Sequence, residues 1–279
     1  MATKEFEKQS DLKRFSLGVE EFALILGLVG KPKDGHIVLA TAHEDIGQID
    51  MDALLSSASH SLLARNFCSL PPNTDQPVLD KGLKQAIACL FHYNQVVHLN
   101  VLTGNAPVQL TIHINSPKAF CAHLNKANMV HLLEYGSWQS LGAYLANTLD
   151  AVVFPTGTKP DSFEAEIPFL VLSSMTKPQG EPIDATSLLK NKGWSSERVN
   201  MLAEDLAHQT LRGILLRVQT DDVESGEKYA QAAKTSLLFL RGKERAWIFR
   251  FDPPDDSAIG LARIIDRKGF DEALKALVK

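Results

Sequence analysis

The chain has 279 residues, of which 44% are hydrophobic and 22% charged, and 29 basic side chains stand against 33 acidic ones for a formal net charge of -4. This composition is typical of a globular protein and excludes disordered, collagen-like and membrane-embedded classes. The length allows one large domain or two smaller ones.

Two features of the sequence predict a cytoplasmic location. The N-terminal segment is charged through Arg14 and lacks the apolar core of a signal peptide, so we expect no export and no membrane partner. The cysteines, Cys68, Cys89 and Cys121, form no CxxC pair, which argues against a disulfide framework and a cysteine-rich zinc site.

The first half is predicted to hold helices followed by strands. We expect a flexible lead-in over residues 1–15 and a polar loop over 33–50. Apolar residues recur at helical spacing over three segments, 16–30, 51–65 and 79–91. The period then changes to two, which predicts strands over 95–102, 108–115 and 127–134, with a hairpin turn at Thr103–Ala106 and a closing helix over 138–149.

The second half is predicted to repeat this order loosely. After an apolar segment at 163–175, helices are expected over 184–191, 196–210 and 268–278, and strands over 212–220, 233–241, 245–252 and 258–265. The prediction is an α+β fold of antiparallel sheets with helical layers, with a pseudo-two-fold repeat as a hypothesis. The two halves would cover residues 16–150 and 151–279, either as domains or within one compact domain.

Short catalytic and cofactor motifs are missing from the sequence. It contains no GxGxxG, Walker A, GxSxG or EF-hand pattern, and the His43-Glu44 pair has Gly47 where a zinc-binding HExxH motif needs its second histidine. We therefore assign no catalytic residue, no metal ligand and no cofactor, and we lean towards a protein that is not an enzyme.

A group of histidines near the predicted hairpin is the richest polar cluster. If the hairpin turns at Gly104-Asn105, His98 and His113 lie one diagonal step apart on its polar face, with Asn100 beside them. Such a face could bind a small molecule or carry acid–base chemistry. The competing interpretation is a solvated sheet face or a polar layer covered by a helix.

A second cluster combines basic and aromatic residues. Arg241, Lys243 and Arg245 flank the tip of a predicted hairpin, ahead of aromatic residues at alternate positions. Basic and aromatic side chains together can bind nucleic acid. The order of the helices at 51–65 and 79–91 before a hairpin also resembles a winged helix. The mixed charge and the strand spacing of the aromatics favour a core role instead, so nucleic acid is the less favoured partner.

Several segments together resemble the EspG family. They are Leu62-Leu63-Ala64-Arg65-Asn66-Phe67 with the short strand and helix that follow, Arg212-Gly213-Ile214, and Ala246-Trp247-Ile248-Phe249 with the terminal helix. Arg65-Asn66-Phe67 departs from the family's arginine-glycine-leucine-like step. The resemblance covers most of the chain and implies an α+β fold and the role of a cytosolic type VII (ESX) secretion chaperone that holds a PE–PPE substrate pair. It assigns no binding residues.

The leading hypothesis is therefore a cytoplasmic, non-enzymatic protein-binding module of the secretion-chaperone type. Such a protein should expose an apolar patch or an unpaired strand edge to its client. The alternatives are a small-molecule binder or enzyme that uses His98, Asn100 and His113, and a winged-helix-like nucleic-acid binder. The sequence leaves the client and the oligomeric state undetermined.

Overall fold

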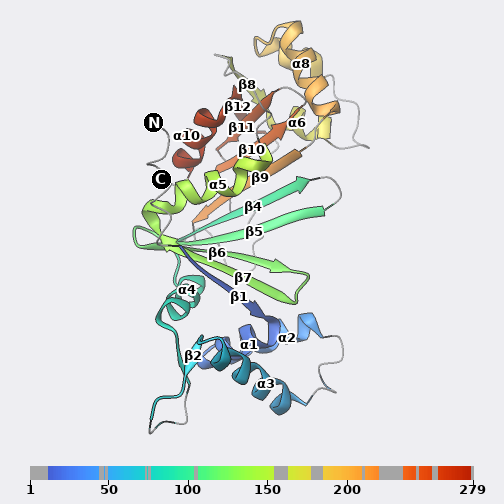
Figure 1. The fold of residues 1–279 in the computed structure, drawn as a ribbon. Coiled ribbons are helices and arrows are strands. Elements are labelled where there is room, and N and C mark those ends of the chain that lie inside the picture. The colour runs from blue at the N-terminus through green and yellow to red at the C-terminus, as the bar shows by residue number, and fades with distance from the viewer. Residues whose placement is uncertain are drawn as a thin grey trace. The chain divides into compact units, whose positions relative to one another are not determined.

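The computed structural model describes residues 12–43, 47, 50–72, 74, 77–103, 106–153, 163–176, 185–208, 211–219, 235–242, 245–252 and 257–277. Its main feature is an antiparallel ten-stranded sheet with the order β1-β7-β6-β5-β4-β9-β10-β11-β12-β8 (Figure 1). A separate two-stranded sheet pairs β2 with β3. The predicted α+β class with antiparallel sheets is confirmed.

The strands run as follows along the chain: β1 Lys13–Gly18, β2 Cys68–Ser69, β3 Val78–Leu79, β4 Gln95–Thr103, β5 Ala106–Asn115, β6 Ala119–Lys126, β7 Val130–Ser137, β8 Glu164–Pro168, β9 Leu211–Gln219, β10 Thr235–Arg241, β11 Ala246–Phe251 and β12 Ile259–Ile265. The helices are α1 Val19–Leu28, α2 Pro32–Ala42, α3 Met51–Ala64, α4 Lys81–Phe91, the 3₁₀ helix η3 Trp138–Ser140, α5 Leu141–Val153, α6 Phe169–Thr176, α7 Ala185–Asn191, α8 Ser196–Ala207 and α10 Arg267–Leu277. Among the described residues, no helix is long and apolar enough to cross a membrane.

The chain divides into two compact units. Unit 1 comprises residues 1–93 and 110–138, and unit 2 comprises 94–109 and 139–279. Strand β4 therefore belongs to unit 2, although the sequence prediction placed it in the first half. The predicted pseudo-two-fold repeat and the predicted domains 16–150 and 151–279 stay predictions.

The core of unit 1 lies between one face of β1, β6 and β7 and the helices α1, α3 and α4. Its buried side chains include Phe15 and Leu17 of β1, Phe22 and Ile25 of α1, and Leu133 of β7. Two of the predicted helices are capped at their N-terminal ends: the carboxylate of Asp50 accepts a hydrogen bond from Ala53 N (3.1 Å) and that of Asp80 from Leu83 N (2.9 Å). Helix α4 begins at Lys81, two residues after its predicted start.

One core cluster of unit 2 packs one face of β10–β12 and β8 against α6, α7 and α8. Trp194, which precedes α8, stacks on Trp247 of β11 with ring centroids 6.1 Å apart. Trp247 stacks in turn on Phe249, at 6.2 Å. The alternating aromatics that sequence analysis associated with a core role do lie in this core.

Three elements differ from their predictions. Lys13–Gly18 forms strand β1, where a lead-in and the start of a helix were expected, because Phe15 and Leu17 point inward at period two and β1 pairs with β7. Helix α2 occupies most of the predicted loop 33–50. Pro32 is the first residue of α2, since proline at the first helical position loses no internal hydrogen bond.

The third difference is strand β6, which the sequence prediction missed. The chain turns between β6 and β7 through Ala127 and Asn128, both in the left-handed region with φ of 52° and 58°. Because this turn contains neither Gly nor Pro, it carries no strong sequence signal. The predicted strand 127–134 therefore began inside a turn, and the observed strand β7 starts at Val130.

Candidate functional site

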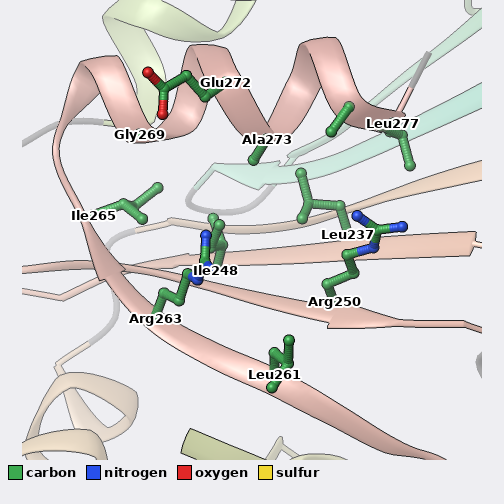
Figure 2. Close-up of a pocket in the computed structure, with 11 residues that line it drawn as sticks. Leu237, Ile248, Arg250, Leu261, Arg263, Ile265, Gly269, Glu272, Ala273 and Leu277 are labelled. Carbon is green, nitrogen blue, oxygen red and sulfur yellow. The ribbon is translucent and has the colours of Figure 1, made fainter. Parts of the chain in front are cut away.

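A groove lies between helix α10 and the sheet of unit 2, and all of its lining residues belong to the described part of the chain. It encloses about 220 Å³ and is lined by residues of β10, β11, β12 and α10 (Figure 2). The strand residues are Leu237, Ile248, Arg250, Leu261, Arg263 and Ile265, and the helix residues are Gly269, Glu272, Ala273, Ala276 and Leu277.

The floor of the groove follows from the strand register. Arg250 pairs with Leu237 on one side and Leu261 on the other, and Ile248 pairs with Arg263. Residues paired across antiparallel strands project to the same face. The floor is therefore an alternation of aliphatic side chains and two arginines. Figure 2 shows both arginines rising from the strands toward α10.

Helix α10 leaves the space open because its buried side carries large apolar residues, whereas its groove-facing side carries small ones. Phe270, Leu274 and Leu277 are buried. Gly269, Ala273 and Ala276 recur at helical spacing and line the groove. Small side chains on this face cannot reach down to fill the gap above the strands.

Contacts with β9 and β10 help to hold α10 in place over the sheet. Phe270 packs edge-on against Phe239 of β10, with ring centroids 6.0 Å apart. Arg217 of β9 donates from Nη1 to the carbonyl oxygen of Leu277 at 3.0 Å, which satisfies a carbonyl in the last turn of the helix. Burial, and to a lesser degree the nearby Arg250, lowers the pKa of Arg217.

The arginines of the floor also make ion pairs. Arg250 Nε lies 2.7 Å from Asp252 Oδ2, and Arg263 pairs with Glu164 of β8. Both side chains remain about half exposed, at 47% for Arg250 and 52% for Arg263. Exposed ion pairs of this kind contribute little to stability, so an incoming carboxylate would replace Asp252 or Glu164 at a small cost.

The predicted histidine face is distributed over both units. His98 and Asn100 lie on β4 in unit 2, and His113 lies on β5 in unit 1. Burial lowers the pKa of His98. The ring of His113 packs edge-on against Tyr93, with centroids 4.8 Å apart, beside the end of α4. A ligand-binding role for His98, Asn100 and His113 stays a prediction.

The basic tip predicted from Arg241, Lys243 and Arg245 is partly described. Arg241 ends β10, and Lys243 lies outside the described residues. Arg245 Nε donates to Oδ2 of the buried Asp205 at 2.7 Å, and Trp247 Nε1 donates to the same oxygen at 2.8 Å. The guanidinium of Arg245 thus serves the packing of α8 on the sheet. Nucleic-acid binding by these residues stays a prediction.

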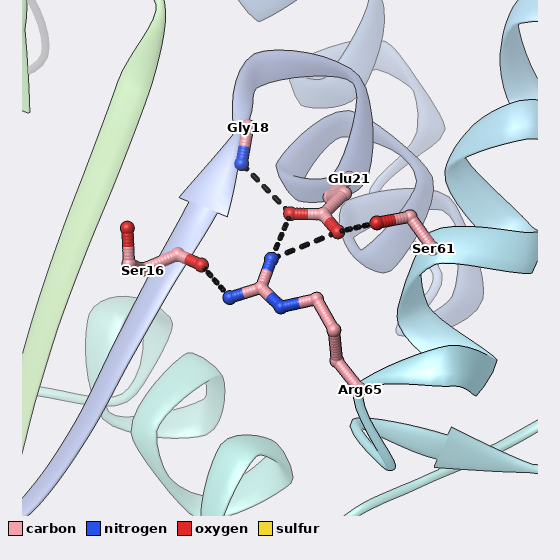
Figure 3. A network of polar contacts seen from close by, with 5 residues as sticks. All are labelled: Ser16, Gly18, Glu21, Ser61 and Arg65. Carbon is pink, nitrogen blue, oxygen red and sulfur yellow. Dashed lines mark hydrogen bonds and ion pairs between the residues drawn. The ribbon is translucent and has the colours of Figure 1, made fainter.

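Glu21 organises a polar network in unit 1 (Figure 3). Its carboxylate accepts hydrogen bonds from Arg65 Nη1 at 2.8 and 3.0 Å, from Ser61 Oγ at 2.7 Å and from the backbone N–H of Gly18 at 2.8 Å. Arg65 Nη2 also donates to the carbonyl oxygen of Ser16 in β1. This network ties strand β1, helix α1 and the end of α3 together, so we assign it a structural role.

Two histidines, the buried His131 and the half-buried His123, form a second polar cluster in unit 1. His123 Nε2 lies 2.9 Å from His131 Nδ1, and Phe22 stacks on His131 with ring centroids 4.2 Å apart. Burial lowers the pKa of both rings to about 4, and for His131 the neighbouring His123 adds to this effect. Among the described residues, no group of three or more His, Cys, Asp or Glu side chains is placed to hold a metal ion.

The groove was not predicted from the sequence because its parts are far apart in the chain. The signals were present but weak. Arg250 and Arg263 interrupt apolar strands at positions that alternate with aliphatic residues, and α10 carries small residues at helical spacing. Only the strand register and the placement of the helix show that these residues line one cavity.

The comparisons with known proteins give a match in fold. No family model and no curated protein sequence matches the chain. Among solved structures, it is similar to the Mycobacterium tuberculosis type VII secretion system chaperone EspG5, solved in complex with the PE25–PPE41 dimer. The match covers 95% of this chain and 96% of that chain, with a TM-score of 0.62 and 9% sequence identity. The comparison shows that the two chains share a fold over nearly their whole lengths.

Proposed function

We propose that the protein is a non-enzymatic chaperone of the secretion type, which binds and holds another polypeptide in the cytoplasm. The observation that carries the proposal is the fold shared with EspG5 over 95% of this chain and 96% of that chain. That structure is of a chaperone in complex with a protein dimer. Because one fold can host many functions, the shared fold supports this role and the surface of this chain must supply the binding.

The strand edges of the sheet are not the surfaces that we expect the client to use. The strands at the two ends of the sheet order, β1 and β8, each have a backbone carbonyl bonded to a side chain from outside the sheet. Arg65 donates to Ser16 O, and Trp194 Nε1 donates to Glu166 O at 2.7 Å. Such contacts obstruct the addition of another strand.

Apolar side chains at the surface offer the alternative. Large apolar residues with at least a third of their surface exposed include Ile37, Leu70, Val78, Ile259 and Leu261. Ile259 and Leu261 are 52% and 41% exposed and share one face of β12. A contiguous exposed apolar patch marks an interaction site where single exposed residues do not, and Ile259 and Leu261 are neighbours on one face of β12.

The test is the isolation of a client. The full-length chain carrying an affinity tag is purified from its native cells, and the enriched proteins are identified by mass spectrometry against an unrelated tagged protein. Each enriched candidate, singly and in pairs, is then co-expressed with the chain and analysed by size-exclusion chromatography with light scattering. We expect a complex of fixed stoichiometry. If the chain elutes alone in every co-expression, the proposal is wrong.

A further inference from the structure

The size of the groove under α10 restricts what can occupy it. Its volume of about 220 Å³ lies below the roughly 300–1,000 Å³ that is typical of sites for whole small-molecule ligands. The space suits one or two inserted side chains. Interfaces between proteins commonly depend on a few such anchors, buried in well-formed pockets.

The charges of the groove select the chemistry of the occupant. Arg250 and Arg263 stand on the floor, and Arg217 adds a third guanidinium close to Arg250. The acidic lining residue is Glu272, whose carboxylate stays at the level of the helix in Figure 2 and does not point down to the strands. The floor therefore favours a carboxylate, which arginine can bind through two parallel hydrogen bonds.

The apolar surface continues from the groove onto β12. Leu261 lines the groove, and Ile259 lies two residues away on the same side of the strand. Both are exposed, at 41% and 52%. An occupant that inserts one apolar side chain can therefore cover further apolar area along β12.

We propose that the groove between α10 and strands β10–β12 docks a segment of the client in which an apolar side chain stands next to an aspartate or glutamate. The apolar side chain fills the space below Ala273 and Ala276, and the carboxylate binds Arg250 and Arg263. This inference rests on the proposed chaperone function and names the docking surface and the chemistry of the bound segment.

Two substitutions test the groove without removing core side chains. Ala276→Trp places a large ring at an exposed position of α10 that lines the groove, and Arg263→Glu reverses one of the floor charges. Their matched controls lie in unit 1. Ala53→Trp makes the same change on an exposed position of α3, and Arg14→Glu reverses the arginine of another strand-borne ion pair, Arg14–Glu134. Thermal melts establish that all four variants fold.

The measurement is the affinity of each variant for the isolated client and for overlapping fluorescent 12-residue peptides that span the client sequence, read by anisotropy. We expect the wild-type chain to select peptides with adjacent apolar and acidic residues. Ala276→Trp and Arg263→Glu should each weaken binding at least tenfold, and the two controls should stay within twofold of the wild type. Changing the acidic residue of the peptide to lysine should restore binding to Arg263→Glu.

The outcomes separate this inference from the proposed function. If the wild-type chain binds its client and both groove variants bind as tightly, the groove is not the docking surface, although the chaperone function stands. Palmitate added as a competing probe should not displace the peptide. If it binds the groove and no peptide does, the occupant is an amphiphile and the inference is wrong. If the wild-type chain binds no client, both proposals fail together.

Discussion

The histidine pair of unit 1 makes a strong prediction about pH. Because the rings of His123 and His131 have pKa values of about 4 in the folded protein and about 6.5 when unfolded, the unfolded chain binds more protons between these values. Stability contributed by the pair is fully present above pH 6.5 and is lost as the pH falls toward 4. One pKa unit corresponds to about 1.4 kcal/mol, so lowering the pH from 7.5 to 5 should cost about 2 kcal/mol for each ring.

The assay is urea denaturation at pH 7.5, 6.5, 5.5 and 5, with the wild-type chain, the double variant His123→Leu/His131→Leu and the control His60→Gln. His60 is exposed on α3. The wild type and the control should lose up to about 4 kcal/mol of unfolding free energy across this range, since two rings contribute. The double variant should lose much less, because only groups common to all three proteins still titrate. An equal pH slope in the double variant and the wild type would refute the reasoning.

Three further substitutions test contacts that hold the fold. Arg65→Met should destabilise the protein by about 2–3 kcal/mol in urea denaturation, because the buried carboxylate of Glu21 loses its cation; an unchanged midpoint would contradict this. Gly213→Ala should cost about 2 kcal/mol, since a Cβ there would lie 2.1 Å from the ring of Phe239, and adding Phe239→Leu should recover part of the loss; additive costs would count against the clash. Trp194→Phe should cost about 1 kcal/mol through the lost hydrogen bond at the edge of β8, as measured by thermal unfolding, and no effect would argue against that contact.

The sequence predicted the elements that local patterns determine. Helices α3, α4 and α8 were all predicted, and each combines an apolar stripe with a capping residue, namely Asp50, Asp80 and Ser195. Strand β1 was not predicted because two alternating apolar residues, Phe15 and Leu17, are too short a pattern to indicate a strand. The strand is stabilised by its pairing with β7. The spacing of apolar residues and the helix caps are local signals, whereas the pairing of β1 depends on residues more than a hundred positions away.

The candidate site was less accessible to sequence reasoning for the same reason. His98 and His113 formed the predicted site because they are polar residues of one kind that lie close together in the chain. The groove instead draws Leu237 from β10, Arg263 from β12 and Ala276 from α10, and none of these residues is distinctive in isolation. A cavity is a property of packing, and its lining residues need share no motif.

The glycine at position 213 connects the packing of the sheet to the groove. Phe239 lies over Gly213, where any side chain would collide with its ring, and Phe239 in turn supports Phe270 of α10. The opposite end of the helix is fixed by Arg217, which donates to Leu277 O. Helix α10 is thus held through its buried apolar residues and its C-terminal turn. Its small residues, on the side that faces the groove, leave the space above β11 and β12 open. A helix anchored in this way can keep a groove open without a ligand. An open groove binds a client segment with no free-energy cost of rearrangement.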